Sequence, residues 1–185
     1  MIYMKNENFL FELLRLGKAR FQNGQFIIFN ATNLIFPTRS FLFLMRLLTE
    51  KCGREECEKI LKEVGKFQIK QAAVRYSQLF QIEKIDKRKI LSEFSPKIGE
   101  LLGLGVFELR ENEVILKNNP IAFEFKEMYG MSKIPIDAYL CGILEEVYSL
   151  LGKPVEVKET KCIACGDLYC QFEVFPAEEK KETKT

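Results

Sequence analysis

Apolar side chains recur along this chain with two different periods, three to four residues in some stretches and two in others. The longer period is typical of helices that pack one face against a core. It predicts helices over 39–52, 54–80, 86–102 and 135–151. Pro37-Thr38 precedes the first of them, with Thr38 as a candidate cap, and Pro96 is expected to kink or split the third.

The period of two appears in pairs of short segments, which is typical of antiparallel hairpins. The predicted pairs are 18–21 with 25–30, 106–110 with 114–117, and 155–160 with 169–175. Asn23-Gly24 is a strong two-residue turn for the first pair. Residues 9–16 fit a strand or a short helix, and 121–132 are expected to be a connector. These elements predict an α+β fold, with an antiparallel sheet of about four to five strands and helices packed on it.

The length of the chain fits one domain. We expect a single α+β domain over 1–176, made of an N-terminal part, 1–118, and a motif region, 119–175. Residues 177–185 are almost free of apolar side chains and are expected to form a disordered tail.

Composition excludes several classes of function. A net charge of +2 gives no basic footprint for nucleic acid, and no apolar run is long enough to cross a membrane. The chain has no His, which removes Ser-His-Asp and Cys-His catalysis and imidazole metal ligands. The first residues lack a secretory signal pattern, so the six cysteines are expected to be reduced thiols in the cytoplasm. The abundance of Lys, Glu, Ile and Phe fits a thermophile.

Cysteines cluster near the C-terminus, where Cys162, Cys165 and Cys170 fall within nine residues. Thiolates are strong zinc ligands, and Cys141 on the preceding predicted helix offers a fourth. The carboxylates that offer oxygen ligands instead are Asp137, Glu159 and Asp167. The alternative is that the thiols are simply buried, as cysteines often are. A metal here is expected to be structural, because a catalytic zinc needs an open position.

Aromatic residues are numerous, with 16 Phe and 6 Tyr. They fit an ordinary core, an apolar cavity for an aromatic or acyl ligand, or a dimer interface. The candidate pocket residues are Phe36, Phe41, Phe80, Phe123, Tyr129 and Tyr139.

The region from Asn119 to Val174 resembles the 4-vinyl reductase domain family. The matching motifs are Asn119-Pro120-Ile-Ala-Phe-Glu, Pro135-x-Asp137-x4-Gly142, Leu151-Gly-Lys-Pro-Val-Glu-Val-Lys-Glu159, and Cys162-Ile-Ala-x-Gly166-Asp167-x2-Cys170-x-Phe172. The resemblance implies a fold shared with ligand-binding domains of nitric-oxide signalling and Golgi transport proteins, which often dimerise around an apolar pocket.

The same resemblance implies a zinc site. In the family's sensor members, zinc is held by Glu and Cys at positions matching Glu159, Cys162 and Cys170, with a further Cys on the preceding helix. Here that helix position is Asp137, so the fourth ligand is Asp137, Cys141 or Cys165. The family's phenol-binding His and Trp are absent from this chain.

The sequence therefore predicts a cytoplasmic, sensor-like module that binds an apolar or aromatic small molecule and carries a structural zinc. It is expected to be a homodimer, to signal through a partner protein, and to contact neither nucleic acid nor membrane. An enzyme is less expected, because no phosphate-binding glycine loop accompanies the chain. The alternatives are a reductase acting on a vinyl tetrapyrrole or similar apolar substrate, and a protein-interaction subunit.

Overall fold

The computed structural model describes residues 9–80, 95–110 and 112–177. Its helices are α1 (Phe9–Arg15), α2 (Thr38–Cys52), α3 (Arg54–Phe80), α5 (Ser95–Leu101), α6 (Pro120–Tyr129), α7 (Ala138–Leu150) and the 3-10 turn η3 (Ile163–Cys165). Its strands are β1 (Ala19–Gln22), β2 (Gln25–Ile28), β3 (Ala31–Asn33), β4 (Val106–Leu109), β5 (Glu113–Lys117), β6 (Val155–Lys161) and β7 (Cys170–Pro176). The start of the third predicted helix, the tail from 178 onward and the side chain of Phe80 lie outside this description.

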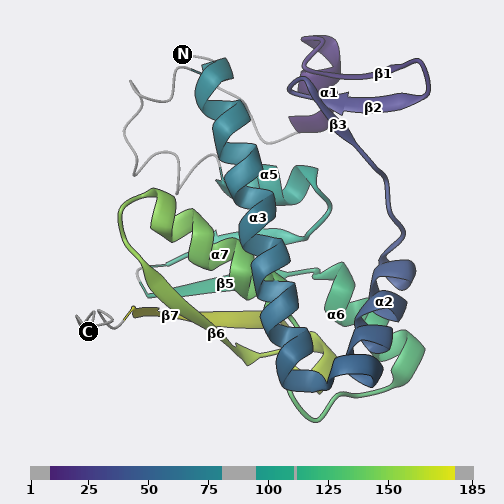
Figure 1. Ribbon diagram of the computed structural model, residues 1–185, viewed down its shortest axis with the longest axis vertical. Coiled ribbons are helices and arrows are strands. Elements are labelled where there is room, and N and C mark those ends of the chain that lie inside the picture. The colour runs from purple at the N-terminus through teal and green to yellow at the C-terminus, as the bar shows by residue number, and fades with distance from the viewer. Residues whose placement is uncertain (1–8, 81–94, 111, 178–185) are drawn as a thin grey trace, which may run out of the picture.

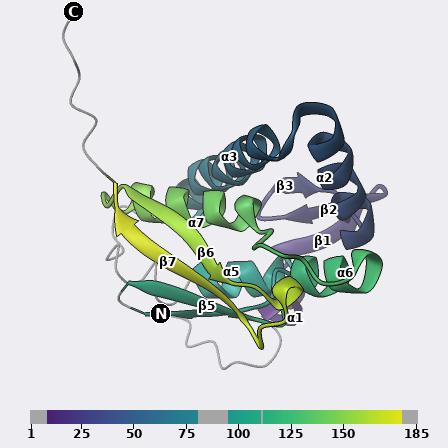
Figure 2. The same cartoon turned by 90° about the horizontal axis from the view of Figure 1, so that it is seen from below.

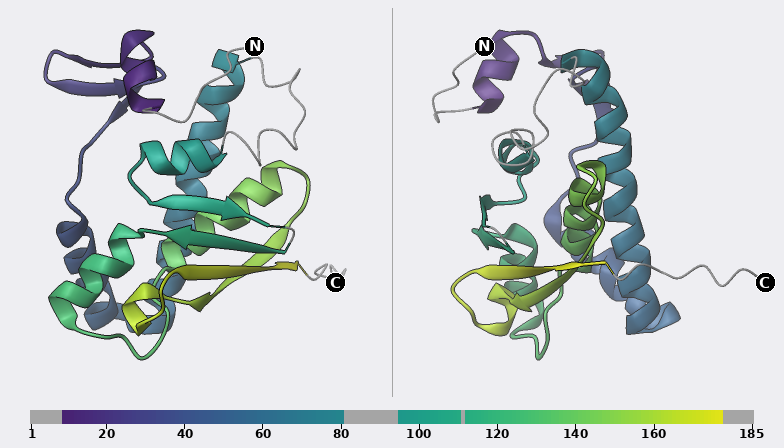
Figure 3. Two further views of the ribbon diagram at one scale, coloured as in Figure 1. Left: turned by 180° about the vertical axis from the view of Figure 1, so that it is seen from behind. Right: turned by 90° about the vertical axis from the view of Figure 1, so that its left-hand side faces the viewer.

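A four-stranded antiparallel sheet with the order β4-β5-β7-β6 organises the C-terminal half. Helix α7 lies against one face of this sheet, and the long helix α3 packs over α7, as two views show (Figure 2, Figure 3). The core between sheet and helices is apolar on both sides and includes Val114, Leu116, Leu140, Leu144, Val157 and Phe172. The predicted α+β architecture is confirmed. None of the helices in the described part is long and apolar enough to span a membrane.

The N-terminal strands form a sheet of their own. β1, β2 and β3 pair in that order, and together with α1 they lie apart from the larger sheet, joined to α2 by an extended segment (Figure 1). The predicted hairpin is confirmed, and Asn23 and Gly24 both adopt positive φ (50° and 76°), as a tight two-residue turn requires. The segment that fitted helix or strand is helix α1, and β3 was not predicted.

Three sequence expectations need correction. The predicted connector 121–132 is largely helix α6, which Asn119 caps and Pro120 opens. Thr38 is the first residue of α2, whereas its cap position is occupied by Pro37. Pro96 falls in the first turn of α5, where a missing N–H leaves no helical hydrogen bond unmade.

Helices α3 and α7 approach each other unusually closely, and glycine makes this possible. A Cβ placed on Gly142 would lie 2.0 Å from the Lys62 carbonyl oxygen, and one on Gly65 would lie 2.3 Å from the Tyr139 carbonyl oxygen. Neither distance is compatible with a side chain. The two backbones therefore meet at the two glycines, which fixes where α7 crosses α3.

Charged side chains hold the same crossing together. Glu145 on α7 is buried and pairs with Lys62 at 2.8 Å and Lys66 at 3.0 Å, both on α3. It also accepts a hydrogen bond from the Val157 amide of β6, at 3.1 Å. Burial raises the pKa of Glu145, but its hydrogen bonds from two lysines and one amide outweigh burial and hold the pKa below its usual value. One carboxylate thus joins α3, α7 and the sheet.

We predict that Gly142→Ala destabilises the protein by about 3 kcal/mol, because the added methyl forces the helix backbones apart. In an uncrowded helix the same change would stabilise by about 1 kcal/mol, so the sign of the effect is diagnostic. Urea unfolding followed by circular dichroism measures it. Ser149→Ala, at an exposed position of the same helix, is the control and should change stability by less than about 0.5 kcal/mol. A Gly142→Ala chain as stable as wild type would contradict the close crossing.

Candidate metal centre

Four acidic side chains from three parts of the fold meet beneath α7. Asp137 stands at the cap position just before α7, and Glu159 lies in β6. Cys162 follows the end of β6, and Cys170 is the first residue of β7. Asp137 makes no capping bond to its own helix, although aspartate is among the best capping residues. Its carboxylate is directed to the cluster instead.

An irregularity in β6 brings Glu159 and Cys162 to the same side. β6 pairs Glu159 with Phe172 but Lys161 with Gln171, so two steps along β6 match one step along β7. Such a bulge shifts the alternation of side chains by one residue. As a result Glu159 and Cys162 are both buried, while Lys161 between them is exposed. The three-residue spacing of Glu and Cys therefore depends on the bulge.

The ligand atoms of Asp137, Glu159, Cys162 and Cys170 all lie within 4.8 Å of one another, and all four residues are buried. Each carboxylate has one oxygen engaged: Asp137 Oδ2 accepts from Asn119 Nδ2 at 2.5 Å, and Glu159 Oε2 accepts from the Asp137 amide at 2.8 Å. The other oxygens, Asp137 Oδ1 and Glu159 Oε1, are buried without a hydrogen-bond partner in the described part of the chain. Buried unpaired carboxylate oxygens are costly, and a cation would satisfy both.

The electrostatics of the cluster are unfavourable without a cation. Burial raises the pKa of Asp137 to about 7. Burial, together with the neighbouring Asp137 carboxylate and Cys162 thiol, raises the pKa of Glu159 to about 10. Contact with the Cys170 thiol and burial raise the pKa of Cys162 as well. A bound divalent cation reverses this balance, because it favours the ionised form of every ligand. The residues present therefore fit a metal ion.

Asn119 connects the cluster to helix α6 and is fully buried. Its side-chain oxygen accepts from the amides of Ile121 (3.0 Å) and Ala122 (3.4 Å), which caps α6. Its Nδ2 donates to Asp137 Oδ2 and to Cys170 Sγ, the latter at 3.3 Å. Sequence reasoning did not assign this role, although the Asn-Pro pair before an amphipathic segment is a recognisable start of a helix.

Backbone amides support the sulfur side of the cluster. The Ile163 amide donates to Cys170 Sγ at 3.4 Å, and the Cys162 amide donates to Asp167 Oδ2 at 2.8 Å. Amide hydrogen bonds to sulfur favour the thiolate, which is the form that binds metals. Asp167, an oxygen alternative in the sequence, thus holds the loop and is not among the four grouped residues.

Two of the six predicted metal ligands lie outside this group. Cys141 is buried one turn into α7, where burial raises its pKa to about 12. Cys165 is half-buried in η3, and burial together with the neighbouring Cys162 raises its pKa to about 11. The structure brings the other four together, so Asp137 is the oxygen donor that stands in the fourth position.

A separate groove of about 360 Å³ opens between α2, α3 and α6. Its lining is apolar in the floor and polar at the rim, and consists of Leu42, Met45, Arg46, Thr49, Glu50, Arg54, Cys57, Glu58, Leu61, Phe125, Tyr129, Ser132 and Ile136. We refer to it as the α2–α3–α6 groove.

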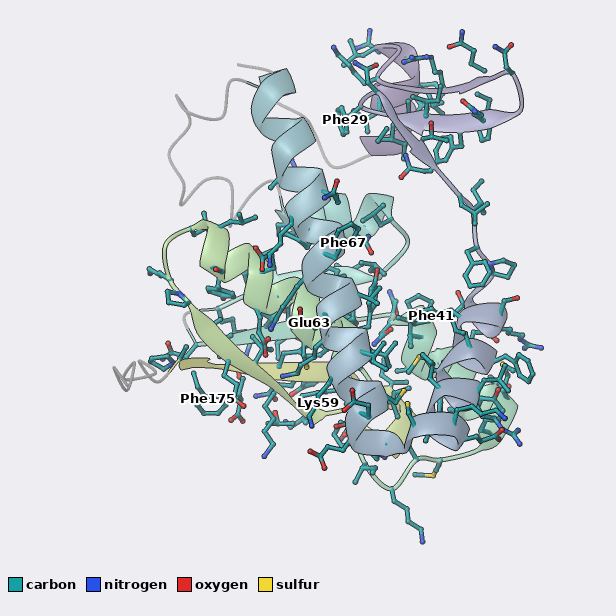
Figure 4. The ribbon with its side chains drawn as sticks, in the orientation of Figure 1. Phe29, Phe41, Lys59, Glu63, Phe67 and Phe175 are labelled. Atoms are coloured by element: carbon teal, nitrogen blue, oxygen red, sulfur yellow. The ribbon has the colours of Figure 1, made fainter. Side chains whose placement is uncertain are left out.

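Of the predicted pocket residues, Tyr129 lines this groove. Phe41 projects from α2 toward α3 (Figure 4) and packs edge to face against Tyr139, with ring centroids 5.3 Å apart. Phe36 and Phe123 are exposed, so they line no interior space. The aromatic count alone could not show which rings face a groove, because most of them pack within the core.

Comparison with known proteins supports the resemblance found in the sequence. Residues 124–176 match the family model of the vinyl-4-reductase domain, and this range spans most of α6 through β7. The 4-vinyl reductase domain resemblance is therefore confirmed for this region. No match is found among curated proteins.

Solved structures share the fold over most of the chain. The phenol-responsive sensory domain of the transcription activator PoxR, with phenol, gives a TM-score of 0.72 at 18% identity, covering 93% of this chain and 90% of that chain. A vinyl-4-reductase family protein from Methanocaldococcus jannaschii gives 0.52 at 20% identity, covering 96% and 100%. A trafficking protein particle complex subunit 3 from Naegleria fowleri, covalently bound to palmitic acid, gives 0.50 at 12% identity, covering 76% and 95%. At these identities the similarity establishes the fold.

We predict that Asn119→Ala lowers the free energy of unfolding by about 2–4 kcal/mol, because it removes a helix cap and two buried hydrogen bonds at once. Asn119→Asp separates the two roles, since aspartate keeps the cap but cannot donate to Asp137 or Cys170. Thermal and urea unfolding of both variants measure the effects. If Asn119→Asp keeps wild-type stability, the amide donors do not support the cluster.

Proposed function

We propose that this chain is a sensor-like module that binds a small molecule and is stabilised by one structural zinc ion. The zinc would be held by Asp137, Glu159, Cys162 and Cys170. The observation that carries the proposal is the buried convergence of these four side chains, with two carboxylate oxygens left unpaired.

The donor set supports zinc over other common ions. Two thiolates favour a soft or borderline metal, and zinc also accepts carboxylate oxygen, whereas magnesium and calcium prefer oxygen alone. Four buried protein ligands complete a tetrahedral shell and leave no open position, which is typical of structural sites. Bound there, zinc supplies charge neutralisation and a crosslink, and the residues of the chain supply the orientation. Asn119 and the Glu159–Asp137 amide bond already hold the ligands in place.

The small-molecule part of the proposal is supported by the fold and by the α2–α3–α6 groove. The PoxR sensory domain, which shares the fold, is described as phenol-responsive. In this chain the groove has a volume within the range of small-ligand sites, near its lower end.

Self-association is part of the same proposal. Apolar side chains are exposed on the segment before α2 and on the outer faces of α2 and α3, namely Leu34, Ile35, Phe36, Phe43, Leu44, Leu47, Val64 and Phe67. Exposed apolar surface of this extent favours contact with a partner, and a second copy would bury it in a homodimer.

We predict that Cys162→Ser loses the bound zinc and several kcal/mol of stability, because binding energy at a structural site is folding energy. Zinc per chain is measured by elemental analysis, and stability by thermal unfolding with and without a chelator. Cys165→Ser is the matched control, since it removes a thiol from the same loop but outside the cluster, and it should retain one zinc per chain. Equal zinc content and melting temperature in Cys162→Ser and wild type would refute the structural zinc.

A further inference from the structure

The α2–α3–α6 groove combines an apolar floor with a small set of polar groups. Leu42, Met45 and Leu61 belong to a second hydrophobic cluster of the fold and are buried beneath the groove. An occupant that rests on these side chains must be largely apolar, because it removes apolar surface from water on both sides.

Two hydrogen-bond donors meet at one end of this floor. The Tyr129 hydroxyl is buried and makes no hydrogen bond within the described part of the chain. The Arg46 guanidinium lies over the Tyr129 ring, with its carbon 5.6 Å from the ring centroid. Arg46 bonds Glu50 through Nε at 2.8 Å, which uses one of its five N–H donors. The rest of the fork is available to a second acceptor.

Converging donors select an acceptor. A guanidinium fork pairs most strongly with a carboxylate, which can take two hydrogen bonds side by side, and a tyrosine hydroxyl can donate a third. The rim otherwise carries balanced charge, since Arg46 pairs with Glu50 and Arg54 pairs with Glu58. An additional cation would meet no unpaired acid there, whereas an additional carboxylate meets unused donors.

We propose that the α2–α3–α6 groove binds an apolar monocarboxylate of modest size. Its apolar body lies on Leu42, Met45 and Leu61, and its carboxylate accepts hydrogen bonds from Arg46 and Tyr129. This inference rests on the proposed small-molecule-binding function and adds the chemical class of the ligand and the residues that select it. It also gives the unpaired Tyr129 hydroxyl a role, because that group would be satisfied only in the bound state.

The test is calorimetric titration of the full chain with octanoate, and with 1-octanol and octylammonium as probes of the same chain length. Octanoate is expected to bind at least tenfold more tightly than either. Arg46→Gln should lower octanoate affinity at least tenfold and remove the preference over octanol. Arg39→Gln is the matched control, since Arg39 lies on the same helix but pairs with Glu124 outside the groove, and it should bind octanoate as wild type does.

Tyr129→Phe provides a second readout. It should weaken octanoate binding several-fold without lowering the melting temperature of the free protein, because the hydroxyl has no partner to lose. Equal binding of octanoate and octanol, or unchanged octanoate binding by Arg46→Gln, would overturn the carboxylate assignment while leaving small-molecule binding intact. No binding of any of the three probes at millimolar concentration would overturn the groove as a ligand site. Zinc content, measured on the same samples, reports separately on the metal part of the proposed function.

Discussion

The burial of four acidic side chains in mutual contact is the constraint on which this structure depends. Two carboxylates and two thiols share a space in which their ligand atoms lie within 4.8 Å of one another. Without a cation, the ionised forms repel one another and lack water, which is why burial raises the pKa of Asp137 and Glu159. With a divalent cation, the same groups attract it and hold together the start of α7 and the two C-terminal strands. The stability of the C-terminal half therefore follows from the charge balance of one small site.

Helix α6 connects this site to the groove on the other side of the helix. Its first turn is capped by Asn119, whose amide also holds Asp137 and Cys170. Its later residues, Phe125 and Tyr129, line the α2–α3–α6 groove. The position of the groove wall is consequently set by the same residue that orients the cluster. A shift of α6 would change both sites, because Asn119 belongs to each of them.

Much of the fold could be predicted because its elements have strong local patterns. The hairpin at Asn23-Gly24 and the helices over 38–52 and 54–80 follow from turn chemistry and periodicity. Helix α6 was missed because ten residues with two aromatic side chains carry a weak helical pattern, and the deciding information is the Asn119 cap. The separation of the N-terminal strands into a second sheet was also not predictable, since strand partners are chosen by tertiary packing.

The cluster was predicted in composition, but its membership needed three dimensions. Spacing could not choose among Asp137, Cys141 and Cys165, because the choice depends on where α7 begins and how β6 bulges. Native mass spectrometry of the untagged chain, purified without chelators and run beside a denatured control, tests the metal centre most directly. We expect a mass increase of one zinc ion per chain that disappears on denaturation. A native mass equal to that of the bare polypeptide would contradict the metal centre.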